Sequence, residues 1–83
     1  MNNIVVLFQP FVLKQKIIVY NNQEFINEYE VDIDAISTLV ETLVKNNPIK
    51  SIKITGNRNY INKYQAEIIS RIPSDRDIDI SIL

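Results

Sequence analysis

The run Ile4-Val5-Val6-Leu7-Phe8 (IVVLF) is the most apolar of the predicted strands, and Gln9-Pro10 ends it. A continuous apolar run of this length, rich in β-branched residues, is typical of a strand at the centre of a sheet. Proline lacks the N–H that a strand ladder needs, which predicts an irregularity at Pro10. We expect Phe11-Val12-Leu13 to continue the strand beyond it. We therefore place this first strand at the centre of the predicted sheet.

Two further strands are predicted directly after the first. Lys16–Tyr20 (KIIVY) is apolar, and Asn21-Asn22 suits a tight hairpin turn because asparagine tolerates a positive φ. Glu24–Val31 (EFINEYEV) alternates between a mostly apolar face, starting at Phe25, and a mostly acidic one. Such alternation is typical of a solvated outer strand, and its acids discourage edge-to-edge aggregation.

A first helix is predicted from Asp32 onward. Asp32 is expected to cap the helix through its carboxylate, and Val31 to pack against Ile36. Asn46-Asn47-Pro48 is expected to end it, with an asparagine in the left-handed conformation. The apolar residues recur with helical spacing, at Ile36, Leu39, Val40, Leu43 and Val44.

The rest of the chain predicts a strand, a helix and a strand. Ile49–Thr55 is the strand, Gly56 ends it, and Asn57 or Asn59 can cap a helix that reaches about Ile72. The inward face of this helix is predicted to consist of Ile61, Tyr64, Ile68 and Ile72. In the last segment Ile78, Ile80 and Ile82 alternate with polar residues, which predicts a one-faced final strand.

The element order βββαβαβ restricts the possible topologies. Crossovers between parallel strands are right-handed in nearly all proteins, so both helices are expected on one face. The sequence thus predicts one α/β domain over residues 1–83, a two-layer sandwich whose mixed five-stranded sheet has the order 3-2-1-4-5.

This order resembles the ribonuclease H-like fold of nucleases, resolvases, transposases and, in elaborated form, actin-like ATPases. In the nucleases of that family, carboxylates in the first strand, the first helix and near the end of the fourth strand hold two metal ions. Here Ile4–Phe8 and Ile52–Asn59 contain no acid, and Glu41, in the first helix, lies off the apolar stripe. The glycine-rich phosphate hairpin of the actin-like relatives and the family's C-terminal helix are also missing. The resemblance implies a topology without its catalytic residues.

Composition excludes several kinds of chemistry. The chain has no cysteine and no histidine, which removes thiolate chemistry and the commonest general base and transition-metal ligand. We therefore expect no enzyme activity, catalytic residue, metal or cofactor. A divergent metal-dependent nuclease remains a third alternative, for which the Asp77-x-Asp79 pair offers carboxylates on one strand face.

Bulk properties also bear on location and partners. No apolar stretch approaches the ~20 residues that span a bilayer, and the first residues lack the basic start of a signal peptide. We expect a cytoplasmic protein without membrane contacts. Its small size and its isoleucine- and asparagine-rich composition suggest a phage or mobile-element protein. The net charge of −1 lacks the strong basic excess of duplex-binding domains.

The turn after the fourth predicted strand is one candidate site. Its residues follow a strand's carboxyl end and precede a helix, where open α/β sheets bind ligands and amides favour anions. One glycine does not make a phosphate-binding motif, and a permissive hinge is the simpler interpretation. The candidate contacts with an anion or nucleic acid are Gly56, Asn57, Arg58, Asn59, Lys53 and Lys63.

The leading hypothesis is an interaction surface on the sheet face that the helices leave uncovered. Parts of the first two strands would be exposed there as an apolar strip within a polar rim, which is the usual anatomy of an interface. The last strand adds an unpaired edge. The expected partner is a second copy or another protein, with nucleic acid as the alternative. The candidate interface residues are Val5, Leu7, Ile18, Tyr20, Ile80 and Ile82.

Overall fold

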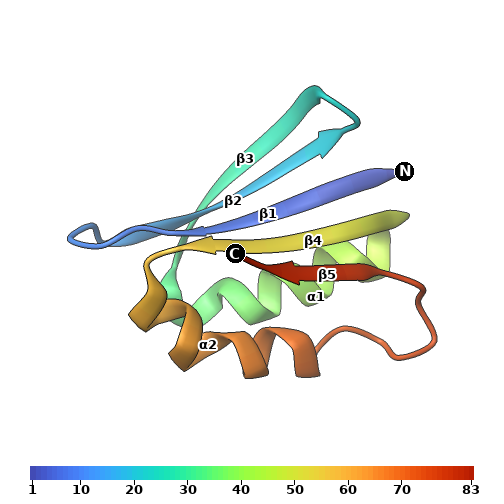
Figure 1. Ribbon diagram of the computed structural model, residues 1–83. Coiled ribbons are helices and arrows are strands. Elements are labelled where there is room, and N and C mark those ends of the chain that lie inside the picture. Colours follow the sequence, from blue (N-terminus) through green and yellow to red (C-terminus); the bar gives the residue numbers. More distant parts are fainter.

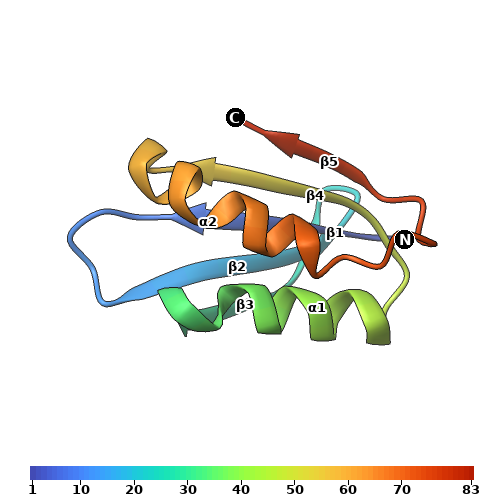
Figure 2. The ribbon, with the colours of Figure 1, turned by 90° about the horizontal axis from the view of Figure 1, so that it is seen from below.

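In the computed structural model, which describes residues 1–83, a five-stranded mixed sheet carries two helices on one face (Figures 1 and 2). The elements in chain order are β1 (Asn2–Phe8), β2 (Lys14–Asn21), β3 (Glu24–Asp32), the 3₁₀ turn η1 (Ile33–Ala35), α1 (Ile36–Asn46), β4 (Ile49–Gly56), α2 (Arg58–Ser70) and β5 (Asp79–Ile82).

The strand order is β3-β2-β1-β4-β5, which confirms the predicted order and the central position of β1. β1 and β3 both run antiparallel to β2, whereas β4 is parallel to β1 and β5 is parallel to β4. The crossovers β3-α1-β4 and β4-α2-β5 place both helices against the same side of the sheet (Figure 2). The α/β class, the mixed sheet and the two helices are thus as the sequence predicts.

The core fills the space between the sheet and the helices. Alternate residues of β1 point into it, because successive side chains of a strand lie on opposite faces. Burial of one such side chain stabilises the fold by roughly 1.5–3 kcal/mol. The buried apolar residues are Ile4, Val6, Phe8, Ile17, Val19, Ile36, Val40, Leu43, Val44, Ile49, Ile52, Ile54, Ile61 and Ile68.

Both ends of α1 differ from the prediction. Asp32 makes no capping hydrogen bond. Its carboxylate lies 3.0 Å from the Lys14 ammonium, and η1 separates Asp32 from the start of α1. Asn47 ends α1 in an extended conformation, with φ −138°, and its side-chain amide donates to the Leu43 carbonyl at 3.0 Å. The predicted side-chain N-cap and left-handed asparagine are therefore wrong.

Two irregularities in the strands also depart from the prediction. Phe11, Val12 and Leu13 do not extend β1 but form an exposed loop, and Phe11 has a φ of +63°. In β3, Phe25 pairs with Tyr20 whereas Asn27 pairs with Val19, so Ile26 is an extra residue. This bulge shifts Phe25 out of the predicted alternation and onto the face that carries Tyr20.

Candidate functional site: the uncovered sheet face

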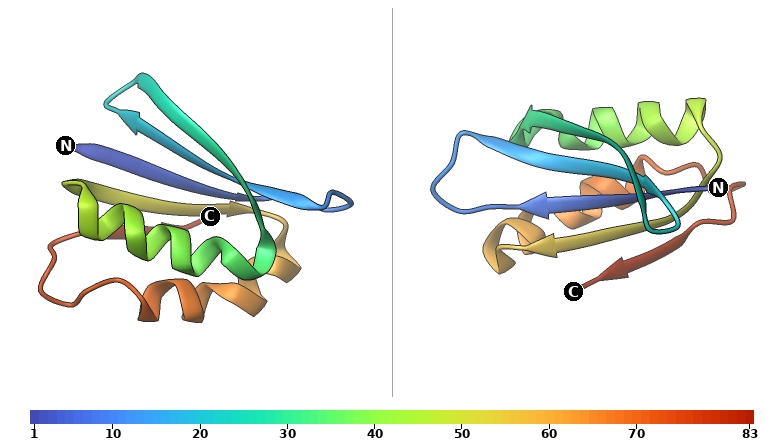
Figure 3. Two further views of the ribbon diagram at one scale, coloured as in Figure 1. Left: turned by 180° about the vertical axis from the view of Figure 1, so that it is seen from behind. Right: turned by 90° about the horizontal axis from the view of Figure 1, so that it is seen from above.

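No helix covers the side of the sheet opposite α1 and α2 (Figure 3, right). On β1 and β2 this uncovered face carries Val5, Leu7, Ile18 and Tyr20. Their neighbours in β1 and β2 point into the core, and these four side chains are only half-buried. The four residues predicted for the centre of an interface therefore lie together on one face.

The strand pairing arranges the uncovered face in rows that cross the sheet. In the middle row Ile18 pairs with Val5, and the apolar pair is flanked by Glu28 on β3 and Lys53 on β4. Ser81 of β5 ends this row. The middle row therefore has an apolar centre, with the acidic Glu28 on the next strand to one side and the basic Lys53 on the next strand to the other.

The rows on either side are more polar. Towards one end, Leu7 lies between Lys16 and Thr55 in the strand pairing. Towards the other, Asn3 pairs with Tyr20, and the Ser51 hydroxyl donates to the Asn3 side-chain oxygen at 2.6 Å. The three rows together form an apolar centre enclosed by polar residues.

On the uncovered face, Lys16 and Glu28 form an ion pair with each other, whereas Lys53 has no ion-pair partner. The Lys16 ammonium lies 3.6 Å from the Glu28 carboxylate, and both side chains are about one-third exposed. Lys53 forms no ion pair within the chain. An ammonium without a counter-charge therefore lies one strand away from the apolar pair.

Ile80 and Ile82, the other predicted interface residues, lie elsewhere. They pair with the buried Ile52 and Ile54, which places them on the helix side of the sheet. Their exposed fractions of 37% and 38% result from the edge position of β5, which has β4 as its only neighbour. They belong to the free edge and not to the uncovered face.

The turn around Gly56 is a tightly packed hinge. Gly56 has a φ of +108° and lies against β1, where a Cβ atom would collide with the Phe8 carbonyl oxygen. The same oxygen accepts a hydrogen bond from the Asn57 backbone N–H at 2.8 Å. The Asn57 side chain caps α2 by accepting from the Tyr60 N–H at 3.1 Å. Two of the groups predicted to contact an anion thus already have structural roles.

The predicted basic residues do not form one patch. Lys53 lies on the uncovered face, whereas Lys63 belongs to α2 on the opposite side and lies over the Tyr64 ring, 5.4 Å from its centroid. Arg58 and Asn59 are exposed at the start of α2. Tyr64 stacks on Phe8, with ring centroids 6.0 Å apart, and is part of the packing around the core.

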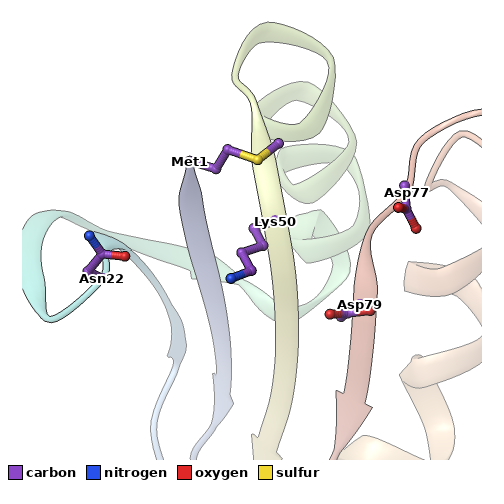
Figure 4. Close-up of a pocket in the computed structure, with 5 residues that line it drawn as sticks. All are labelled: Met1, Asn22, Lys50, Asp77 and Asp79. Atoms are coloured by element: carbon purple, nitrogen blue, oxygen red, sulfur yellow. The ribbon is translucent and has the colours of Figure 1, made fainter.

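Carboxylates are dispersed over the molecule. Glu41 forms one ion pair within α1, with Lys45 at 3.4 Å, and a second at 3.5 Å with Arg71, which directly follows α2. Only the second connects the two helices. Asp77 and Asp79 line a shallow open pocket of about 480 Å³ with Met1, Asn22 and Lys50 (Figure 4). No three or more acidic residues lie close enough together to hold a metal ion.

The loop between β1 and β2 is a second exposed apolar feature, which the sequence prediction missed. Phe11 is fully exposed and Leu13 is 92% exposed. The buried Gln15 closes the base of this loop: its Oε1 accepts from the Gln9 N–H at 2.5 Å, and its Nε2 donates to the Gln9 carbonyl at 3.1 Å. The available signal was Pro10, which ends the ladder before three more apolar residues.

Compared with known protein families, curated proteins and solved structures, the chain matches none. None of its helices has the length and apolar character needed to cross a membrane.

Proposed function

We propose that the protein is a non-catalytic interaction or assembly module that binds another protein chain through its uncovered sheet face. The observation that carries this proposal is the half-exposed pair Val5–Ile18 at the centre of that face. Water contacts apolar side chains there, and a partner that covers them gains roughly 25 cal/mol for each Å² of apolar surface removed from water.

Polar residues around the apolar centre support the same function. Interfaces that form and dissociate combine an apolar core with a polar rim. Here Glu28 and Lys53 flank the centre on either side, and Asn3 and Ser51 close one end. The rim can align a partner, whereas the apolar centre supplies the affinity.

The alternatives have less support. A nucleic-acid surface would require Lys53, Arg58 and Lys63 to act together, but Lys53 and Lys63 lie on opposite sides of the sheet. We also propose that the fold is ribonuclease H-like in topology. The support is the strand order β3-β2-β1-β4-β5, which is the order that this resemblance implies. Nuclease chemistry is not part of the proposal, because Glu41 is held in ion pairs with Lys45 and Arg71 and no three acidic residues are placed to hold a metal ion.

The test compares the wild type with Ile18→Lys, which places a charge at the centre of the uncovered face. Ile69→Lys is the matched control, because Ile69 is an exposed isoleucine of α2 on the helix side. Light scattering over a range of concentrations measures self-association, and affinity capture measures binding to other proteins. We expect Ile18→Lys to lose association that the control retains.

The proposal fails if the wild type stays monomeric and captures the same proteins as Ile18→Lys. Titration of labelled single-stranded DNA and RNA over a salt series tests the nucleic-acid alternative. Phosphate contacts would weaken steeply as salt is added.

A further inference from the structure

We infer that the occupant of the uncovered face is a second copy of this chain, bound face to face around a two-fold axis that runs between β1 and β2. The inference rests on the proposed function and specifies its partner and register. It follows from the middle row, Glu28–Ile18–Val5–Lys53, which occupies four successive strands.

The row is self-complementary. An axis along the mean direction of β1 and β2, between Ile18 and Val5, has Glu28 one strand beyond Ile18 and Lys53 one strand beyond Val5. Rotation by 180° about such an axis turns the second copy to face the first and reverses the row. Ile18 of each copy then faces Val5 of the other, and Glu28 of each copy faces Lys53 of the other. In an isologous contact every pairing occurs twice, so the apolar centre is closed by two ion pairs.

The charges already present favour this arrangement. Lys53 has no partner within its own chain, and Glu28 has a single one, Lys16, at 3.6 Å. A carboxylate has two oxygens and accepts from two cations. The second copy therefore gives Lys53 a counter-charge without breaking the ion pair between Lys16 and Glu28.

The outer rows fit the same rotation. Leu7 faces Lys16 of the second copy, whose aliphatic stem can cover it while its ammonium stays in water. Tyr20 faces Asn3 of the second copy and so meets a neutral polar side chain. No like charges face each other at any of these positions.

The dimensions of the whole molecule allow a dimer interface of ordinary size. A standard interface buries about 800 Å² on each partner. The two longest extents of the molecule are 32 and 26 Å, and the whole chain exposes 5137 Å². Sheets packed face to face cross at about 30° and lie about 10 Å apart, which is within the combined reach of glutamate and lysine side chains.

The charge pairing makes the test specific. Glu28→Lys and Lys53→Glu each place like charges opposite one another twice in the dimer. We expect each single variant to raise the dimer dissociation constant at least about tenfold, because like charges at an interface oppose association. Sedimentation velocity of each purified protein over a concentration series measures this constant.

Mixing the two single variants is the decisive step. The two lysines of the Glu28→Lys copy then face the two glutamates of the Lys53→Glu copy, so both ion pairs form, one of them with reversed polarity. We expect the equimolar mixture to form a heterodimer with a dissociation constant within about threefold of the wild-type value, whereas neither variant dimerises well alone. The double variant Glu28→Lys/Lys53→Glu should self-associate like the wild type.

Glu30→Lys is the control, because Glu30 lies on the same face of β3 and undergoes the same change of charge but faces Thr55 of the second copy. Its dissociation constant should stay within about threefold of the wild-type value. Circular dichroism of every variant shows whether it is folded, so that a failure to fold is not counted as a loss of contact.

Three results overturn the inference. If the wild type is monomeric at all concentrations but captures another protein in an Ile18-dependent way, the second copy is wrong and the proposed function stands. If the wild type dimerises but the mixed variants do not recover, this register is wrong and the face still binds. If the wild type neither dimerises nor captures a protein, both proposals fall.

Discussion

Val5 and Ile18 are cross-strand partners at the centre of a sheet and are both only half-buried. The adjacent residues on the same strands, such as Ile4 and Ile17, are completely buried against the helices. At this position β1 and β2 are therefore apolar on both faces, but the helices cover only one of them. This asymmetry is the reason to look for the function on the uncovered face.

Gly56→Ala should destabilise the fold strongly. The new Cβ would collide with the Phe8 carbonyl oxygen, and a φ of +108° is strained for any residue with a Cβ. We expect the free energy of unfolding, measured by urea denaturation, to fall by at least about 3 kcal/mol. A loss below about 1 kcal/mol would show that the hinge can relax away from β1.

Gln15→Met should destabilise the base of the β1–β2 loop. The substitution keeps the side-chain volume but leaves the Gln9 N–H and carbonyl without their partner. We expect a loss of about 1–3 kcal/mol in the free energy of unfolding. Gln23→Met in the exposed β2–β3 turn is the control and should change it by less than about 0.5 kcal/mol. If both variants lost the same free energy of unfolding, Gln15 would have no special role at the base of the loop.

Phe11→Asn should cost no stability although it removes a phenyl ring. Phe11 is fully exposed and has a φ of +63°, a conformation that asparagine adopts more readily. We expect an unchanged or slightly higher melting temperature by circular dichroism. A clear fall would mean that the phenyl ring packs against the fold in solution.

Glu41→Gln should have a small effect. The ion pairs with Lys45 and Arg71 are partly exposed, and such pairs contribute about 1 kcal/mol or less. We expect a loss of that size by chemical denaturation, and a smaller loss at high salt because ions screen these pairs. A loss of several kcal/mol would contradict this account of Glu41 as a surface residue.

The sheet order followed from local patterns in the sequence. The apolar runs mark the strands, Asn22 with its φ of +56° marks the turn between β2 and β3, and Gly56 marks the hinge between β4 and α2. These local signals all agree with the same fold. The handedness of crossovers then left few topologies. The four central residues of the uncovered face follow from the same reasoning, because alternation assigns Val5 and Ile18 to the face opposite Ile4 and Ile17.

Features that depend on tertiary contacts were not predictable in this way. Asp32 looks like a helix cap, but the antiparallel pairing of β2 with β3 brings Lys14 within 3.0 Å of it. The bulge at Ile26 moves Phe25 to the other face, and the regular alternation of Glu24–Val31 does not reveal the extra residue. The separation of Lys53 from Lys63, by contrast, follows from strand alternation and crossover handedness, which together place Lys53 on the face opposite the helices.

Concentration-dependent NMR of the methyl groups tests the central claim most directly, namely that the uncovered face is the contact between two copies. On dilution of the wild type, we expect the methyl signals of Val5, Leu7 and Ile18 to shift together while those of Leu39 and Ile69 on the helices stay constant. Signals that do not move at any concentration, or that move on the helices instead, would contradict it.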